Sequence, residues 1–319
     1  MALLDQKQRG NQKEHASPWK LGGLSVTELG KRVGKRMGAD EDDVFGRAAA
    51  LAYYFFLALF PGLLFVLTVF GFIVGNNPQV GQRVMQSLSS MMPGQASQLV
   101  QQTIQQTALS AAGWLLIVGV IGALWSASSG FASLMTTLNF AYNVKETRAW
   151  WKARAISIGL TIVAGLLMLA AILISIFGGF ILSQVGGAVG LGGALNGLWR
   201  YGQYVVALFF VILAVAVVYR WGPAVKSQRW HWITPGATIA VLVWVVASVG
   251  LRIYLHFSNS YTKSYGSLGA VIILLLWFYI SGLALLIGAE VNSEIENAAA
   301  ERGRRDAKPK GEKQELAAA

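Results

Sequence analysis

The sequence lacks cysteine and holds few residues of the kinds that carry out catalysis. Without cysteine, the chain has no disulfide, no thiolate metal ligand and no cysteine nucleophile. The three histidines, His15, His231 and His256, show none of the spacings typical of metal ligands. We therefore expect no metal site, no cofactor and no enzymatic activity.

Acidic residues are also scarce in the middle of the chain, where Glu146 is the one carboxylate between Val44 and Ala289. A carrier driven by protons or sodium ions relies on carboxylates inside the membrane. A two-metal nuclease needs several carboxylates close together. The sequence argues against both classes of protein.

Long apolar segments are the most prominent feature of the sequence. Hydrophobic residues make up 55% of the 319 residues, and charged residues only 13%. Six nearly charge-free runs lie at 48–75, 112–138, 155–182, 202–219, 233–256 and 267–289. About 20 apolar residues span a bilayer, and continuous rather than alternating runs favour helices. The sequence predicts an all-α polytopic membrane protein with six transmembrane helices.

Lysine and arginine gather in every second connection between these runs. Of the 26 basic residues, the segment before the first run holds nine, the second connection four, the fourth connection three and the C-terminal segment six. The positive-inside rule then predicts a multi-pass bacterial inner-membrane protein with both termini in the cytoplasm. The net charge of +11 is explained by this topology, so we expect anionic membrane lipid as a partner and not nucleic acid.

The polar segments divide the chain into a leader at 1–43, a membrane domain at 44–296 and a basic tail at 297–319, which we expect to be disordered. In the leader, Leu24, Leu29 and Val33 are spaced for one helical face among interleaved cations. This pattern fits either a short interfacial helix over 24–37, with cations meeting anionic headgroups, or an irregular basic anchor.

Two further connections carry recognisable patterns. The external segment 75–111 has apolar residues at helical spacing over 80–91 and again over 99–108, which predicts two amphipathic helices. The glycine-rich segment 186–197 lacks the lysine of a phosphate-binding loop, so we expect a mobile external linker there.

The predicted outer face carries basic residues and no acidic ones. These are Arg83, Arg200, Arg252 and Lys263. They fit either a surface for an anionic ligand such as a lipid phosphate, or cations that extend from helix ends toward the headgroups. Arg252 lies inside the fifth apolar run, where an arginine is costly unless it serves a function or reaches the headgroups.

A second candidate site combines the first two runs. Pro61 lies near the middle of the first and predicts a kink. Ser126, Ser128 and Ser129, followed by Gly130, lie at a similar depth in the second. Small and hydroxyl residues permit close helix packing, so this pair of segments fits either ordinary packing or a transporter-like broken-helix site.

Glu290 closes the last apolar run, where a carboxylate at a helix C-terminus opposes the helix dipole. Such a residue requires a partner, and Arg47 or Arg154 on the same predicted side are candidates. We expect a structural salt bridge at the membrane edge in preference to a ligand site.

Several segments together resemble one family, the YihY/BrkB-like inner-membrane proteins, also called the virulence factor BrkB family and formerly labelled ribonuclease BN. The matching segments are 47–54, Phe60-Pro61, 138–144, 151–154, 265–270 and 288–292. The resemblance implies six helices, both termini in the cytoplasm and an envelope role, with some relatives connected to lipid movement; it also implies that the ribonuclease label is a misassignment. Its best-matched positions here are Tyr53, Pro61, Asn139, Tyr265, Gly266 and Glu290.

Two functional hypotheses remain. The first is a membrane protein that handles or transports anionic envelope lipid, and the second is a non-transporting scaffold for an envelope-assembly partner. A ribonuclease is disfavoured, because no cluster of acids or histidines is available. The sequence does not determine the oligomeric state.

The topology can be tested with fusions of alkaline phosphatase and of a fluorescent protein at four positions. We expect Gln95 and Gly190 to report the periplasm, and Lys145 and Ala319 to report the cytoplasm, because basic residues hold their loops inside. A periplasmic Ala319 would contradict the assignment.

Overall fold

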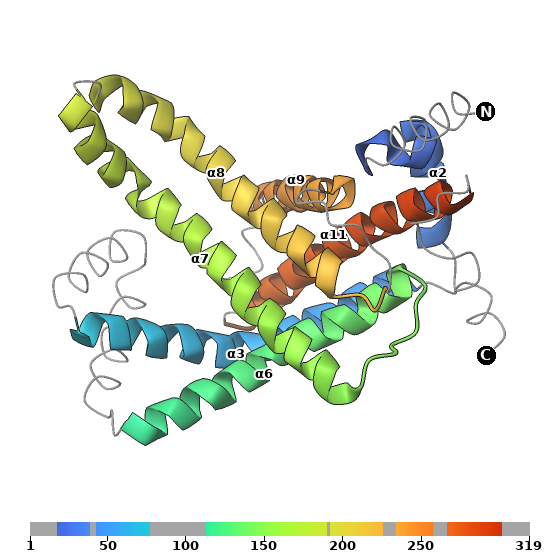
Figure 1. The fold of residues 1–319 in the computed structure, drawn as a ribbon, viewed down its shortest axis with the longest axis horizontal. Coiled ribbons are helices and arrows are strands. Elements are labelled where there is room, and N and C mark those ends of the chain that lie inside the picture. Colours follow the sequence, from blue (N-terminus) through green and yellow to red (C-terminus); the bar gives the residue numbers. More distant parts are fainter. Residues whose placement is uncertain are drawn as a thin grey trace, which may run out of the picture. The chain divides into compact units, whose positions relative to one another are not determined.

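The computed structural model describes residues 18–38, 43–76, 113–189, 192–225, 234–257 and 267–301, and these residues form helices without strands (Figure 1). The long helices are α3 (Val44–Asn76), α6 (Gly113–Ala141), α7 (Trp150–Val189), α8 (Gly192–Trp221), α9 (Pro235–Phe257) and α11 (Ser267–Glu301). Each coincides with one predicted apolar run. Within the described residues, all of them except α6 are long and apolar enough to cross a membrane. The predicted all-α polytopic fold is confirmed, and a span in α6 stays a prediction.

The chain divides into two compact units, residues 1–55 with 131–319, and residues 56–130. Helices α3 and α6 each run from one unit into the other. In the smaller unit, α3 continues as one helix through Pro61. The predicted kink and the packing of Pro61 against Ser126–Gly130 stay predictions.

Helices α7 and α8 lie side by side as a long antiparallel hairpin (Figure 1). The expectation of a mobile glycine-rich linker over 186–197 was wrong for most of that segment. Helix α7 continues to Val189 and α8 begins at Gly192. Helix propensity is a weak local preference that tertiary packing overrides, and α7 and α8 pack against each other along this hairpin.

The buried core of the larger unit lies where the helices converge. It draws on the start of α3, the end of α6, the first half of α7, the end of α8 and the adjoining parts of α9 and α11. Alanines such as Ala48, Ala237 and Ala289 are fully buried there. Small side chains let helix backbones approach closely, which is how helices associate without a hydrophobic driving force in lipid.

A close approach joins α9 to α11 at Gly236 and Gly288. A Cβ atom on either glycine would clash with the carbonyl oxygen of the other. The side chain of Asn292 locks the same crossing, because its Oδ1 accepts from the Gly236 N–H (3.0 Å) and its Nδ2 donates to Thr234 Oγ1 (3.1 Å). Tyr219 of α8 adds a third helix by donating to the Leu285 carbonyl.

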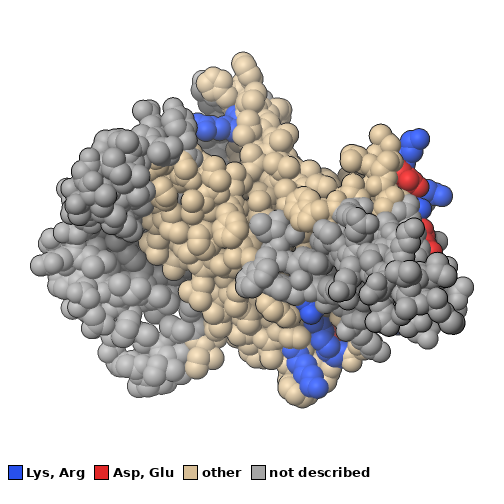
Figure 2. Space-filling model, turned by 45° about the horizontal axis from the view of Figure 1, so that its top comes forward, with Lys and Arg blue, Asp and Glu red and all other residues tan. Residues whose placement is uncertain are grey.

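On the face that Figure 2 shows, most of the described surface is uncharged, and lysine and arginine gather in small areas. Large apolar side chains are exposed along α7, α8 and α9, as expected for helices that face lipid. Leu166, Val205 and Val246 are examples, each at least 60% exposed.

Two short helices precede α3: the 3-10 helix η1 (Pro18–Gly23) and α2 (Val26–Met37). Ser25 caps α2 by accepting from the Glu28 N–H, and Lys35 and Arg36 occupy its last turn. The helical alternative for 24–37 is therefore confirmed. Helix α11 also continues to Glu301, so residues 297–301, expected in the tail, are helical. The predicted helices at 80–91 and 99–108 and the remaining tail lie outside the described residues.

Candidate functional site

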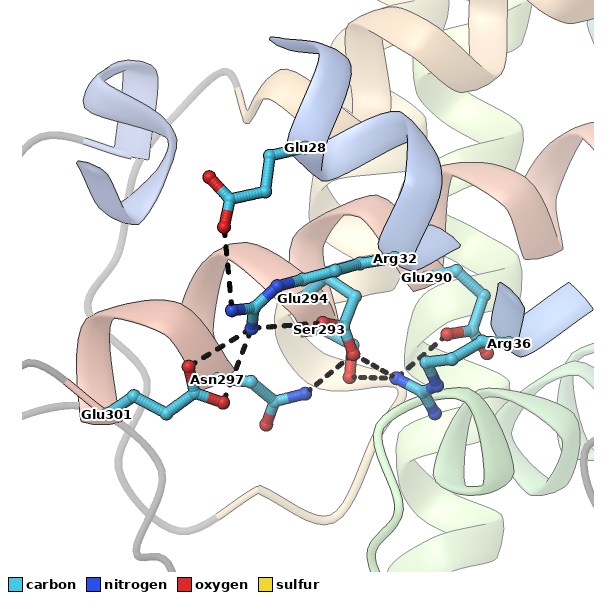
Figure 3. A network of polar contacts seen from close by, with 8 residues as sticks. All are labelled: Glu28, Arg32, Arg36, Glu290, Ser293, Glu294, Asn297 and Glu301. Carbon is cyan, nitrogen blue, oxygen red and sulfur yellow. Dashed lines mark hydrogen bonds and ion pairs between the residues drawn. The ribbon is translucent and has the colours of Figure 1, made fainter. Parts of the chain in front are cut away.

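Charged side chains of α2 and α11 form one network, which we call the α2–α11 clamp (Figure 3). Its members are Glu28, Arg32, Arg36, Glu290, Ser293, Glu294, Asn297 and Glu301. The two helices pair with opposite chain directions, since Arg36 meets Glu290 and Arg32 meets Glu301. The clamp therefore ties the N-terminal segment to the end of the last long helix.

Arg36 is the most buried cation of the clamp. Its Nη1 lies 2.9 Å from Glu290 Oε2 and donates to Ser293 Oγ and to Glu294 Oε1, each at 3.1 Å. Its Nη2 donates to the Ala141 carbonyl at the end of α6 (3.1 Å). The side chain of Glu290 is 1% exposed and that of Glu294 is 6% exposed. One guanidinium thus neutralises two buried carboxylates and joins three helices.

Arg32 forms the outer part of the clamp. It donates to both carboxylate oxygens of Glu301, at 3.1 and 3.3 Å, and lies 3.9 Å from Glu28. Glu28 and Glu301 are about half exposed. Exposed pairs of this kind contribute about 0.2–1 kcal/mol each, so the inner end at Arg36 dominates the clamp.

An apolar contact runs beside the charged one. Leu24, Leu29 and Val33 pack against Val291, Ile295 and Ala298 of α11. Gly22, with a φ of 60°, lets η1 approach α11 so closely that a Cβ atom would meet the Ile295 carbonyl at 2.5 Å. The interfacial alternative had the cations of this helix meeting anionic headgroups; in the structure the apolar face and both arginines contact α11 instead.

The predicted partners of Glu290, Arg47 and Arg154, were also wrong, because Arg36 takes this position. Arg47 lies over the ring of Phe140, 3.4 Å from its centroid. A spacing signal for the correct pairing was present in the sequence. Arg32 and Arg36 are four residues apart, and so are Glu290 and Glu294. Equal i,i+4 spacing places each pair on one helical face.

A second polar cluster closes the connection between α6 and α7. The buried side chain of Asn139 donates to Glu146 Oε2 (2.9 Å) and accepts from the Ala224 N–H (2.7 Å). Arg148 pairs with Glu146 at 2.7 Å and donates to the carbonyls of Trp221, the last residue of α8, and of Gly222. Burial alone would raise the pKa of Glu146, but the hydrogen bonds from Arg148 and Asn139 and the charge of Arg148 hold that pKa below its usual value.

The other predicted site residues are dispersed. Arg252 is exposed near the end of α9, and Tyr53 is exposed on α3. Ser128 is fully buried and donates to the Trp125 carbonyl, whereas Ser126 is half-buried and Ser129 exposed. The backbone of Arg200 lies in α8, but its side chain, like Lys263, Tyr265 and Gly266, lies outside what is described. Among the candidate residues whose side chains the structure describes, Glu290 and Asn139 belong to polar networks of several contacts.

The described residues bring no three of His, Asp and Glu into a group that could hold a metal ion. Long apolar helices, lipid-type surface and small-residue packing define a polytopic α-helical membrane protein. The chain belongs to a particular family of this class: the model of the Virulence factor BrkB family matches residues 37–313. The match begins directly after Arg36, so both arginines of the clamp precede it.

Relatives agree with this assignment. The chain is 33% identical over 247 residues to a putative ribonuclease-like protein, YfkH, of Bacillus subtilis, covering 77% of this chain and 88% of the relative. It is 28% identical over 260 residues to a UPF0761 membrane protein of Stenotrophomonas maltophilia, and 25% identical over 262 residues to one of Xanthomonas oryzae. Each of these two matches covers 80% of this chain and 58% of the relative. No solved structure matches the chain.

The inner end of the clamp can be tested by Arg36→Met. This change removes the guanidinium that lies 2.9 Å from buried Glu290 and donates to Glu294, which keeps Arg32 at 4.0 Å, so we expect a loss of about 3–5 kcal/mol in the free energy of unfolding. The measurement is denaturant-induced unfolding in detergent micelles. The neighbouring exposed Lys35→Met serves as control and should change stability by about 0.5 kcal/mol or less.

Adding Glu290→Met to Arg36→Met removes one stranded charge and should recover part of the loss. Equal stability of Arg36→Met and Lys35→Met would show that the clamp contributes nothing.

Proposed function

We propose that this protein is a bacterial inner-membrane protein of the envelope that handles anionic lipid, with the headgroup held at Arg252. The observation that carries the proposal is the exposure of this arginine on an apolar span. Arg252 is exposed beside Ile253 and Tyr254, which are also exposed, and Val249 is exposed one turn earlier. A guanidinium in such surroundings attracts an anion that can approach from the lipid.

The charge distribution supports the same function. Among the described residues of α9, no carboxylate is available to Arg252, because the segment from Val44 to Ala289 contains Glu146 alone. Glu146 is already paired with Arg148. A phosphate therefore supplies the charge that the chain does not, and the planar guanidinium suits bidentate phosphate binding.

The names of relatives bear on this proposal only weakly. The UPF0761 proteins are called membrane proteins, which fits a role within the bilayer. The Bacillus relative is called ribonuclease-like, but the acids and histidines of this chain offer no cluster for such chemistry. Handling of lipid remains the function that the exposed cation supports best.

Replacement of Arg252 tests the proposal. Arg252→Gln should lower the retention of phosphatidylglycerol relative to phosphatidylethanolamine roughly fivefold, since one basic residue near an anionic surface contributes about 1 kcal/mol. Native mass spectrometry of the protein purified in mild detergent measures the ratio. Arg252→Lys, which keeps the charge, should retain most of the preference, and Arg252→Glu should abolish it.

All three variants should insert and express at normal yield, because the side chain is exposed. Unchanged lipid retention in Arg252→Gln would remove the proposed headgroup site. The scaffold for an envelope-assembly partner would then be the better hypothesis.

A further inference from the structure

Helix α2 divides its four cations between two faces. Arg32 and Arg36 point toward the acids of α11 (Figure 3). Lys31 and Lys35 are exposed and form no ion pair with any residue that the structure describes. The clamp therefore uses only half of the positive charge of this helix, and the two lysines lie on a neighbouring face, about 100° around the helix axis from the arginines.

The surroundings of the two lysines are open. Gly30 and Gly34 lie beside them on the exposed face, and a Cβ atom added to either glycine would have nothing within 4 Å. Within the described residues, this side of the α2 backbone is thus uncovered. The residue types fit these positions. Arginine suits buried ion pairs with several hydrogen bonds, as in the clamp, whereas lysine is a strongly hydrated point charge that suits an exposed face.

The clamp sets the depth of these lysines. Glu290 is the first acidic residue after the apolar run of α11, so it marks where this helix leaves the hydrocarbon. Arg36 meets Glu290, and therefore Lys35, its neighbour in sequence, lies at a similar level. Lys31 lies one turn further out, by about 6 Å along the helix axis. This difference is smaller than the screening length of about 8 Å at physiological salt.

We propose that Lys31 and Lys35 form a docking surface for anionic phospholipid headgroups of the cytoplasmic leaflet, while Arg32 and Arg36 hold the helix to α11. Charge complementarity selects the occupant, because the cytoplasmic leaflet carries a negative surface potential that attracts basic residues close to it. This surface is separate from the outer-leaflet site at Arg252 and does not depend on it. It does require the predicted cytoplasmic position of the N-terminal segment.

A fluorophore at Gly34→Cys provides a local readout, because the chain has no other cysteine and this position is open. The labelled protein is placed in nanodiscs that contain phosphatidylglycerol or phosphatidylcholine with a nitroxide high on one acyl chain. The ratio of quenching by the two lipids measures the local preference for the anionic headgroup. We expect this ratio to exceed one and to fall with added salt.

The pair Lys31→Gln and Lys35→Gln should lower the preference roughly fivefold for each lysine removed, since each contributes about 1 kcal/mol near the surface. Lys35→Gln alone should have the larger effect, because it lies closer to the membrane. The matched control Lys145→Gln with Lys152→Gln removes the same charge from exposed positions elsewhere and should leave the ratio at Gly34 unchanged.

Hydrogen exchange of α2 separates lipid docking from a structural role. The lysine pair should leave the protection of α2 unchanged, since neither residue contributes to the clamp. An unchanged quenching ratio in the lysine variant would overturn the proposal, and so would a loss of α2 protection. An equal fall in the Lys145 and Lys152 control would also overturn it, because the effect would then be one of net charge.

Discussion

A carboxylate that is buried where a helix leaves its apolar run requires a cation, and Glu290 imposes this constraint on the whole structure. Its side chain is 1% exposed, so an unpaired charge there would be strongly destabilising. Arg36 supplies the cation for Glu290, and it can reach this carboxylate only because α2 packs against α11. The same guanidinium reaches Glu294 and the Ala141 carbonyl at the end of α6. A single electrostatic requirement thus fixes the N-terminal segment, the last long helix and the end of α6 in one arrangement.

The rest of the larger unit is held together mainly by close helix packing. In an apolar medium the helices gain little from hiding hydrophobic surface, and close packing takes over. Gly236 and Gly288 bring α9 and α11 together, and Asn292 and Tyr219 add hydrogen bonds at the same crossing. Beyond this crossing the helices expose apolar side chains. The charged residues therefore fall into two groups. Arg32 and Arg36 form ion pairs with the acids of α11, whereas Arg252, Lys31 and Lys35 are exposed.

The sequence predicted the helices well, because the thickness of a bilayer sets the length of an apolar run regardless of tertiary packing. It also offered a helix around Leu29 as one of two alternatives, and it predicted a salt bridge at Glu290. It did not identify Arg36 as the partner, because that pairing joins residues far apart in the chain and depends on how α2 folds back. The helices in the glycine-rich segment were missed because glycine's low helix propensity is a weak local preference, which the packing of α7 against α8 overrides. The exposure of Arg252 depends on the rotation of α9, which periodicity alone did not fix.

The central claim, that α2 is docked antiparallel along the end of α11, is tested most directly by a distance between the two helices in a bilayer. The absence of native cysteine allows two spin labels to be introduced alone, at Gly30→Cys and Ala300→Cys, for electron paramagnetic resonance in nanodiscs. The account predicts one short, narrow distance distribution, because Arg32, two residues from Gly30, contacts Glu301. A broad or long distribution would contradict the clamp and everything inferred from the depth at which it holds α2.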